Sequence, residues 1–576
     1  MLADLDLALK QPLQLIEKLY VEGSWNLDQF EHRIESTFST LLKDARDQLP
    51  AITSLSDQSR LPSPGTLVRF RAMVQDTGYG TELYRAIGAK DQLLMYGLEE
   101  TADDSDNSAA HEDYSKLKER QIFYVVSPPG ETKWVKGSLD GHSSQEIESG
   151  LSNLSLSPPS APSATTSMPE KIPLPFEPNF GLITKIYTDL GDKLRSTDVY
   201  EFVGILGETP LTNAFDVFEH SDSASPPRSV PALHVLYALP SPSPFPTQQL
   251  REPAESDTIR HELIKYIARE GGLGQDLEAA EWVLLALIAR IHTRHATGLA
   301  LGSLSLNLSL PLAPTNSSTT ETSPSSSLIR TLSALVPSLA PLSLTINSLN
   351  DPSSRFSPRS RDESLDSGML QLTKGTNVVI DLTKLGEGKL NDTGVRNLRS
   401  LSTTVSQQKL VYEFPFSSFE LETDLGFLVV SEGKAIVPTD CVVYVEPTRT
   451  SAGEKEKRES PSEEELNRFR SFLQDAKYSQ FSIPPSMSDV IQSDFVERRQ
   501  SSHAGGSGGA MTQEDLLFRM TVSRLMALSY GKRELDSESW TRTAELDERR
   551  KERVPLVVRQ RQQQEVEARS RKGGMD

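Results

Sequence analysis

The stretch Thr376 to Leu385, "TNVVIDLTKL", carries residue types that could take part in nucleotide chemistry. An apolar run that ends in an acid, here Asp381, is typical of a buried strand that holds Mg²⁺ beside a triphosphate in nucleotide-hydrolysing domains. Such a site also needs a glycine-rich turn, whose backbone N–H groups converge on the phosphates, followed by a lysine and a hydroxyl. No G-x-x-x-x-G-K-[ST] sequence occurs in this chain.

The loop that should cradle the phosphates follows the strand pattern "LSLNLSL" and has the wrong composition. From Pro311 to Leu332 there is neither a glycine nor a lysine. The position after Asp381, where a glutamate would activate water, is Leu382. The sequence therefore predicts that the cradle and the base for hydrolysis are both missing. Taken alone, the string "VVID" is more typical of a core strand with a capping acid, and its place in an alternating α/β run favours the Mg²⁺-site position without restoring activity.

Other candidate sites have weaker support. His292 and His295 are three residues apart near an expected helix end, but no cysteine or acidic cluster accompanies them, so a metal site is not predicted. The glycine-rich run Arg269 to Asp276, "REGGLGQD", is read as a turn rather than a phosphate loop. The single cysteine, Cys441, excludes internal disulfides and is expected to pack as a small apolar residue. The Gly/Ser stretch "HAGGSGGA" is read as a plain loop.

Length and composition limit the possible classes of protein. The 576 residues suffice for about three or four domains. Only 36% of residues are hydrophobic, and the formal net charge of −20 argues against a protein that mainly coats phosphate backbones. No apolar run reaches the roughly 18 to 20 residues of a membrane span, and the start lacks a signal-peptide pattern, so we expect an intracellular protein. The basic stretch 549–572 is read as a solvated helix or tail.

The N-terminal half predicts two packed helices followed by a β region. Apolar residues at helical spacing occupy "PLQLIEKLY" and "WNLDQFEHRIESTFSTLL". In "TLVRFRAMVQD" the period is two, as in a half-buried strand, with Phe70 on one face and Arg69 and Arg71 on the other. Four more strand patterns, "QIFYVVSPPG", "GLITKIYTD", "DVYEFVGILG" and "PALHVLYAL", suggest a small barrel or sandwich. Because Phe70 faces away from both arginines, nucleic-acid binding by this strand is not favoured.

From about Ser256 helices and strands alternate, which indicates an α/β layer with a mostly parallel sheet. The helix "EAAEWVLLALIARIHTR" is apolar enough to be largely buried. Strands are expected at "LGSLSLNLSL", "LSLTINSLN", "GMLQL", "NVVIDLT", "KLVYEFPF", "GFLVVSEG" and "CVVYVEP", with helices at "SSLIRTLSALVPSL" and "VRNLRSLSTTVSQQ". Capping boxes at Ser462 and Thr512, and a glycine cap at Gly531, mark C-terminal helices.

The order of these blocks resembles the mini-chromosome maintenance (MCM) complex-binding protein family. The resemblance rests on "TLVRFRAMVQDTGYGTELY", "RQIFYVVSPPGETKWVK", "SGMLQLTKGTNVVIDLTKLGEGKLNDTGVRNLRSL" and "SEGKAIVPTDCVVYVEP", and it covers about Leu13 to Arg550. It implies a likeness to MCM helicase subunits, with Asp381 at the Walker B aspartate position and Leu382 in place of the catalytic glutamate. It also implies a sensor strand without its asparagine in "GFLVVSEG" and a lid helix in "LLFRMTVSRLMALS", with no second-sensor arginine between Gln500 and Phe518.

The resemblance implies function by association. Members of that family bind MCM subunits, are implicated in keeping MCM complexes assembled, in releasing them from chromatin and in sister-chromatid cohesion, and are nuclear. We therefore expect a nuclear, non-enzymatic protein with no catalytic residue, cofactor or metal ligand, no membrane or small-molecule partner, and contact with chromatin only through MCM. The sequence does not identify the partner-binding residues. Alternatives are a single-strand-binding OB-fold protein and an ATPase with an unorthodox loop.

The expected fold class is a multidomain α+β protein with disordered inserts. We expect an N-terminal helical region at 1–60 and an OB-like β barrel region at 61–240, with inserts at about 99–117 and 137–171. A degenerate AAA-like α/β domain with a mostly parallel sheet should span 256–450, with a flexible loop at about 311–327. A C-terminal helical lid at 461–545 and a charged tail at 546–576 complete the chain.

Overall fold

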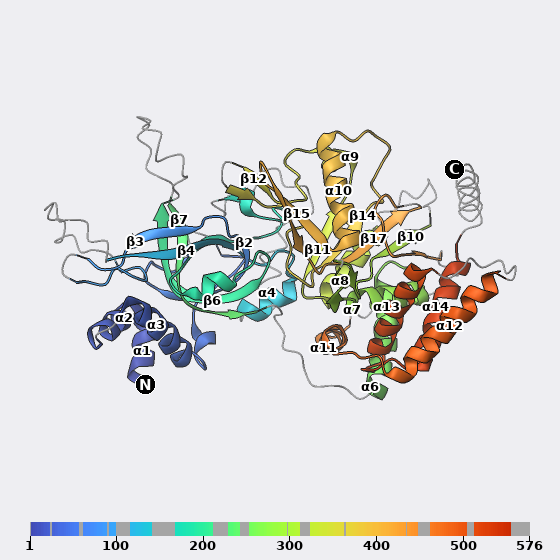
Figure 1. Ribbon diagram of the computed structural model, residues 1–576, viewed down its shortest axis with the longest axis horizontal. Coiled ribbons are helices and arrows are strands. Elements are labelled where there is room, and N and C mark those ends of the chain that lie inside the picture. Colours follow the sequence, from blue (N-terminus) through green and yellow to red (C-terminus); the bar gives the residue numbers. More distant parts are fainter. Residues whose placement is uncertain are drawn as a thin grey trace. The chain divides into compact units, whose positions relative to one another are not determined.

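A computed structural model gives the fold (Figure 1). It describes residues 2–554 except 24–25, 57–60, 89–90, 99–115, 141–167, 211–228, 242–252, 297, 312–322, 362–363, 434, 447–460 and 504–511. Most of the predicted insert 99–117, which is acidic, most of the Ser/Pro-rich insert 137–171, most of the "HAGGSGGA" loop and most of the charged tail lie outside the described residues. The fold is mixed α/β with several sheets, one of them fully parallel, which confirms the predicted mixture of helices and parallel strands.

The chain forms two compact units, each built from noncontiguous segments. The first, here called the barrel unit, comprises Met1–Pro244, Pro352–Lys374 and Leu410–Thr423. The second, the parallel-sheet unit, comprises Phe245–Asp351, Gly375–Lys409 and Asp424–Asp576. Two segments of the region that was expected to be one α/β domain therefore belong to the barrel unit.

Five strands of the barrel unit close on themselves. In the order β2-β6-β7-β5-β4 each strand pairs with the next, and β4 pairs back with β2. The β5–β7 pair is parallel and the other four pairs are antiparallel. Short strands β1 and β3 add to β2 and β4. The bounds are β1 Ala51–Ile52, β2 Leu67–Asp76, β3 Thr81–Arg85, β4 Leu117–Val126, β5 Gly181–Ile186, β6 Val199–Pro210 and β7 Ser229–Pro240.

Both faces of β2 are covered. Val68, Phe70, Ala72 and Val74 join one core cluster with aromatic and aliphatic residues of β4 to β7, which confirms the predicted inward face. The expectation of a half-buried strand is wrong for the other face, because residues such as Gln75 are fully buried there. A strand that closes a barrel and also receives other segments on its outer surface no longer shows the two-residue burial period.

Helices α1 (Leu2–Lys10), α2 (Pro12–Val21) and α3 (Leu27–Leu41) lie together beside the barrel (blue in Figure 1). Phe30, Ile34 and Phe38 recur every four residues along α3, so they share one face, and all three are buried. That face joins the same core cluster as Val203 of β6 and Leu236 of β7. The two predicted N-terminal helices are confirmed, and they anchor to the barrel rather than standing alone.

The two inserted segments of the barrel unit form a small sheet in the order β13-β12-β15-β16. Its strands are β12 Arg359–Arg361, β13 Ser364–Asp366, β15 Lys409–Glu413 and β16 Ser418–Glu422. The predicted strand "KLVYEFPF" begins as β15 but is not part of the parallel sheet. The predicted strand "GMLQL" is wrong: Gln371 N donates to Gly368 O, and Leu372 N donates to Leu370 O, as in successive turns.

Short helices complete the barrel unit: α4 Lys133–Asp140 and the 3₁₀ turns Arg46–Gln48, Pro169–Lys171 and Asp189–Lys193. The prediction that 137–171 is disordered throughout is wrong at its end, because Lys171 is fully buried in a 3₁₀ turn. Likewise Leu117, placed in the acidic insert, begins β4. Polar composition suggested a loop at both places, and partners distant in the sequence order these residues instead.

The parallel-sheet unit contains five parallel strands in the order β11-β14-β17-β10-β18. They are β10 Leu306–Leu310, β11 Leu339–Ser343, β14 Asn377–Asp381, β17 Gly426–Glu432 and β18 Cys441–Tyr444. The prediction of a strand over "LSLTINSLN" is correct for its first part, but its end forms a short helix, α9. Helices here are α6 Pro253–Glu270, α7 Leu277–Ile288, α8 Pro324–Leu335, α9 Ile346–Asn350 and α10 Asp392–Gln407, with a two-stranded ribbon of β8 Thr293–Arg294 and β9 Ala300–Leu301.

The C-terminal helices α11 Glu463–Tyr478, α12 Pro485–His503, α13 Gln513–Ser529 and α14 Ser537–Glu552 belong to the same unit. The predicted capping boxes at Ser462 and Thr512 are both formed, and Gly531 follows α13 with a left-handed φ of 72°. Helix α7 lies at the centre of the core, with Trp282 fully buried among residues of the sheet, α6, α11 and α13. This confirms that the apolar helix is largely buried.

Candidate functional site

The carboxyl edge of the parallel sheet is the place where ligands usually bind in open α/β sheets. Asp381 is the last residue of β14 and lies opposite Ser343 of β11 and Val430 of β17. Strand β10 ends beside β17, with Leu310 opposite Glu432. The topology therefore places Asp381 at the same edge of the sheet as the end of β10. An acid that binds Mg²⁺ beside a phosphate loop would have to lie at this position.

The Asp381 carboxylate is committed to its own turn. It is 4% exposed, and its Oδ1 accepts hydrogen bonds from Thr383 N at 3.0 Å and from Thr383 Oγ1 at 2.7 Å. The next side chain, Leu382, is buried, and its backbone N–H donates to Val430 O. No carboxylate therefore follows Asp381 to activate water, and the acid itself acts as a turn cap.

The polar groups beside Asp381 are also paired with one another. Asn307 of β10 and Ser431 of β17 are both buried, and Ser431 Oγ lies 2.9 Å from Asn307 Oδ1 and 3.1 Å from Gly433 O. Ser309 Oγ donates to the same carbonyl of Gly433 at 3.3 Å. These contacts join β10 to β17 and leave the two hydroxyls engaged within the protein.

Helix α8, which follows the loop after β10, offers little at its N-terminus to a phosphate. Its N-cap, Ser323, accepts a hydrogen bond from Ser326 N at 3.3 Å, and Pro324 at the first position has no N–H to donate. Loop residues 312–322 lie outside the described residues, but their sequence contains no glycine or lysine. The predicted loop 311–327 is wrong at its end, since α8 begins at Pro324.

Replacing Asp381 should affect stability and leave nucleotide response unchanged. We expect Asp381→Ala to lower the free energy of unfolding by about 1–3 kcal/mol, because Thr383 loses its buried acceptor. Mg-ATP should shift the thermal midpoint of neither the parent nor the variant protein. Thr383→Val, which removes only the hydroxyl donor, is the matched control and should cost less. A nucleotide-dependent rise in midpoint that Asp381→Ala abolishes would contradict this assignment.

Helix α13, which the resemblance predicts to be a lid helix, carries arginines after the segment 500–518, and one of them has a structural role. Arg519 NH1 donates to Asp494 Oδ2 of α12 at 2.6 Å, and its guanidinium lies 4.2 Å from the ring centroid of Trp540 on α14. Arg519 is buried. It therefore holds three helices together and is not presented as a sensor for a nucleotide.

His292 and His295 are not at a helix end, because α7 ends at Ile288 and the two histidines flank β8. Their backbone N–H groups donate to Leu301 O and Leu299 O across the ribbon. Within the described ranges, no group of three or more His, Cys, Asp or Glu side chains is placed to hold a metal ion.

The other two weak candidates have structural roles. Arg269 to Asp276 forms the turn between α6 and α7, as predicted, and Asp276 Oδ1 accepts from Glu278 N and Ala279 N as the N-cap of α7. Cys441 is buried, and burial raises the pKa of its thiol to about 12. It therefore packs as a small apolar residue, as predicted.

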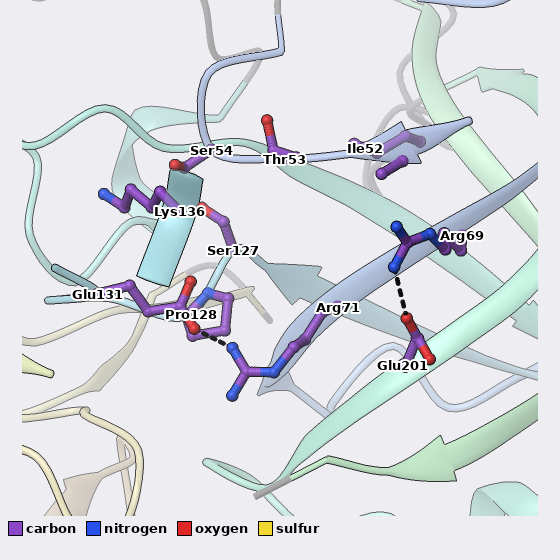
Figure 2. A pocket seen from close by; sticks show the side chains of 11 residues that line it. Ile52, Thr53, Ser54, Arg69, Arg71, Ser127, Pro128, Glu131, Lys136 and Glu201 are labelled. Atoms are coloured by element: carbon purple, nitrogen blue, oxygen red, sulfur yellow. Dashed lines mark hydrogen bonds and ion pairs between the residues drawn. The ribbon is translucent and has the colours of Figure 1, made fainter. Parts of the chain in front are cut away.

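A small pocket on the barrel contains Arg69 and Arg71 (Figure 2). Arg69 forms an ion pair with Glu201 at 3.2 Å, and Arg71 with Glu131. Burial lowers the pKa of Arg71 to about 10. The pocket volume of about 30 Å³ accommodates one or two water molecules, not a nucleotide base. Since both guanidiniums have carboxylate partners, the pocket gives no support to single-strand binding by this face.

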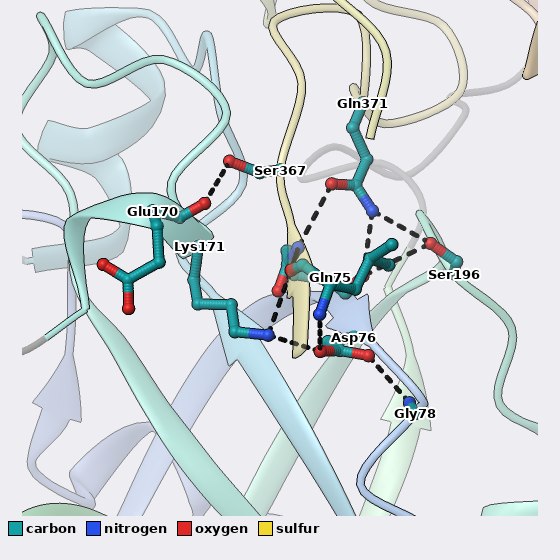
Figure 3. A network of polar contacts seen from close by, with 9 residues as sticks. Gln75, Asp76, Gly78, Glu170, Lys171, Ser196, Ser367 and Gln371 are labelled. Carbon is teal, nitrogen blue, oxygen red and sulfur yellow. Dashed lines mark hydrogen bonds and ion pairs between the residues drawn. The ribbon is translucent and has the colours of Figure 1, made fainter. Parts of the chain in front are cut away.

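A buried polar network joins the inserted segments to the barrel (Figure 3). Lys171 Nζ pairs with Asp76 and donates to Leu365 O at 3.0 Å. Gln371 Nε2 donates to Gln75 O at 2.8 Å and lies 3.0 Å from the hydroxyl of Tyr412. The partners are 41 to 296 residues apart, so no local sequence pattern could have identified them.

Among the described residues, no helix has the length and apolar character needed to cross a bilayer.

Comparison with known proteins identifies the family. The model of the Mini-chromosome maintenance replisome factor family matches residues 38–168 and 143–554. The mini-chromosome maintenance complex-binding protein of Danio rerio is 27% identical over 94% of this chain and 96% of its own length. That of Arabidopsis thaliana is 30% identical over 89% and 91%, and that of Homo sapiens 27% over 95% and 97%. The chain therefore belongs to the Mini-chromosome maintenance replisome factor family.

Proposed function

We propose that this protein is a non-catalytic binding partner of the MCM replicative helicase complex. The observation that carries the proposal is the family match over most of the chain, whose relatives are named as MCM complex-binding proteins. The closed five-stranded barrel supports an OB-like assignment for 61–240. The alternating parallel-sheet unit supports an AAA-like assignment for the second region.

The carboxyl edge explains why such a protein would bind without hydrolysing. Asp381 caps its own turn, Leu382 takes the place of a base, and the serines of β10 and β17 contact internal acceptors. A subunit-like body without these groups could contact a ring subunit while taking no part in its hydrolysis cycle. The same reasoning leads us to propose a nuclear protein that keeps MCM subunits assembled or releases them from chromatin, with a consequence for sister-chromatid cohesion.

Affinity capture tests the proposal. The full-length chain, immobilised and incubated with nuclear extract, is expected to retain MCM subunits that mass spectrometry identifies, and to bind at least one purified subunit directly. Absence of every MCM subunit from the eluate, together with no binding of purified subunits, would refute the proposal. Binding of oligonucleotides that weakens steeply with salt, without MCM binding, would favour the single-strand-binding alternative instead.

A further inference from the structure

The hairpin 413–423 of the barrel unit, here called the aromatic hairpin, places three phenylalanines at the surface. It comprises the last residue of β15, a tight turn, the edge strand β16 and the residue that follows β16. Phe414 is 37% exposed, Phe419 60%, and Phe416 is as exposed as in an extended chain. Exposed aromatic rings that gather on one surface often mark a contact site. When a partner covers such a ring, roughly 150–250 Å² of surface is removed from water.

The base of the aromatic hairpin is rigidly held. Tyr412, the residue before it, is 3% exposed, and its hydroxyl lies 2.9 Å from Ser196 Oγ and 3.0 Å from Gln371 Nε2. At the other end Thr423 is buried. The exposed rings therefore stand on a base that is fixed in the barrel unit by the network of Figure 3.

The tip is also ordered. Phe414 N donates to Ser417 O at 2.9 Å, which closes a turn around Pro415, whose ring fixes its own φ. The rings of Phe414 and Phe419 meet edge to face with centroids 5.5 Å apart. Aromatic side chains presented by an ordered turn lose little conformational entropy when a partner covers them. Such preorganisation is typical of interface anchors and is not needed by a solvated loop.

Charge identifies the kind of partner. From Leu410 to Thr423, the segment of the barrel unit that contains the hairpin, the chain has three acidic residues and no lysine or arginine. Two of the acids, Glu420 and Glu422, lie at exposed positions of β16, the strand that also carries Phe419, and the third, Glu413, pairs with Arg359 of β12 at 3.9 Å. The two exposed carboxylates disfavour contact of the hairpin with phosphate backbones and anionic lipid headgroups. Together with the exposed rings, they are complementary to a protein surface with an apolar pocket and a basic rim.

We propose that the aromatic hairpin is a docking element that inserts Phe416 and Phe419 into an apolar, basic-rimmed pocket of an MCM subunit. This inference rests on the proposed function and names the surface that performs it. Phe416 is the central anchor because it is the most exposed ring, and the acids of β16 contribute at the rim. The barrel network acts as the support that sets the position of the hairpin.

Binding of the full-length chain to purified MCM subunits, measured by biolayer interferometry, tests the inference. Phe416→Ser is expected to weaken binding by about 30-fold or more, as for a central interface anchor. Glu420→Lys should slow association several-fold, with a smaller effect at high salt. The matched control is Leu83→Ser, which removes a 61% exposed apolar side chain on β3 of the same unit and should leave affinity unchanged.

The outcomes separate this inference from the proposed function. If the parent chain binds a subunit and Phe416→Ser binds equally well, the docking inference fails while the proposed function stands. If the parent chain binds no subunit, both fail. A fall in thermal midpoint of the free protein with Phe416→Ser would show that the ring packs within its own chain and would overturn the inference. Sedimentation showing a dimer that Phe416→Ser dissociates would overturn it in favour of a second copy.

Discussion

Asp76→Ala is expected to lower the free energy of unfolding of the barrel unit by about 3–5 kcal/mol, as observed when one partner of a buried ion pair is removed. Asp76 is 2% exposed, and Lys171 is fully buried. Without the carboxylate, the ammonium of Lys171 keeps the carbonyl of Leu365 and the ring of Tyr79 but no anionic partner, and Leu365 N and Gly78 N lose their acceptor. Chemical denaturation followed by fluorescence and by circular dichroism measures the loss.

The double variant Asp76→Leu with Lys171→Met is the control. It replaces both charges by apolar side chains of similar size, and it should recover most of the lost stability because no unpaired charge remains buried. If Asp76→Ala alone costs less than about 1 kcal/mol, the pair is open to water and the buried network is not what holds the inserted segments. Lys374→Ala, which removes an exposed ion pair with Asp198, should have little effect by comparison.

Acidification is expected to destabilise the barrel unit through His234. The ring is buried, and the pKa is lowered from 6.5 to about 3, chiefly by burial and also by the cations Arg120 and Lys185. Tyr187 OH accepts from Arg120 NH1 at 2.9 Å and from Tyr96 N at 3.2 Å, so it donates its own proton to His234 Nδ1 at 2.6 Å. A proton on Nδ1 would therefore meet a donor rather than an acceptor.

The sign of the pH dependence follows from these two pKa values. Between pH 6.5 and pH 3 the unfolded chain binds a proton at His234 that the folded chain does not, so the free energy of unfolding falls as pH falls. Two pH units below 6.5 correspond to a loss of about 3 kcal/mol. Glu82 does not offset this, because its carboxylate pairs with these two cations, Arg120 at 2.7 Å and Lys185 at 3.5 Å.

His234→Gln isolates this contribution. The glutamine oxygen can still accept from Tyr187 but does not titrate, so the variant should lose less stability than the parent chain between pH 6.5 and pH 4.5. His32→Gln, at an exposed histidine of α3, serves as the control and should keep the parental slope. Equal slopes for the parent chain and His234→Gln would show that His234 becomes protonated without cost in the folded protein.

Elements with a strong apolar period could be predicted from the sequence. The helix around Trp282 and the strand ending in Asp381 were found because burial on one or all faces imposes a regular spacing of apolar residues. The helix starts at Ser462 and Thr512 were found because capping chemistry is local. The absence of a phosphate cradle followed from composition alone. These features depend on neighbours within a few residues.

Features that depend on distant partners could not be predicted. The sequence places Lys171 in a disordered insert because the Ser/Pro-rich segment before it has no apolar period, yet Asp76, 95 residues away, pairs with it in the core. "GMLQL" has the composition of a strand, but Gly368 lies against the backbone of Phe356 and Ser357, where a Cβ would collide, and the chain turns there. The predicted strand "KLVYEFPF" covers only the first four residues of the aromatic hairpin, and no prediction covers the rest, because exposure cannot be inferred from residue type.

The barrel unit consists of three separate segments of the chain, so it can complete its folding only after the last of them has been synthesised. Its first segment ends at Pro244, but its last one ends only at Thr423, which is 179 residues later (423 − 244). At roughly 5–20 residues per second, synthesis needs about 10–40 s after Pro244 to add both inserted segments. Segment 352–374 supplies Leu365 and Gln371 to Gln75, Asp76 and Lys171, and segment 410–423 supplies Tyr412 to Ser196. A ribosome-bound chain therefore exposes an incomplete barrel throughout that interval, which makes it a substrate for chaperones.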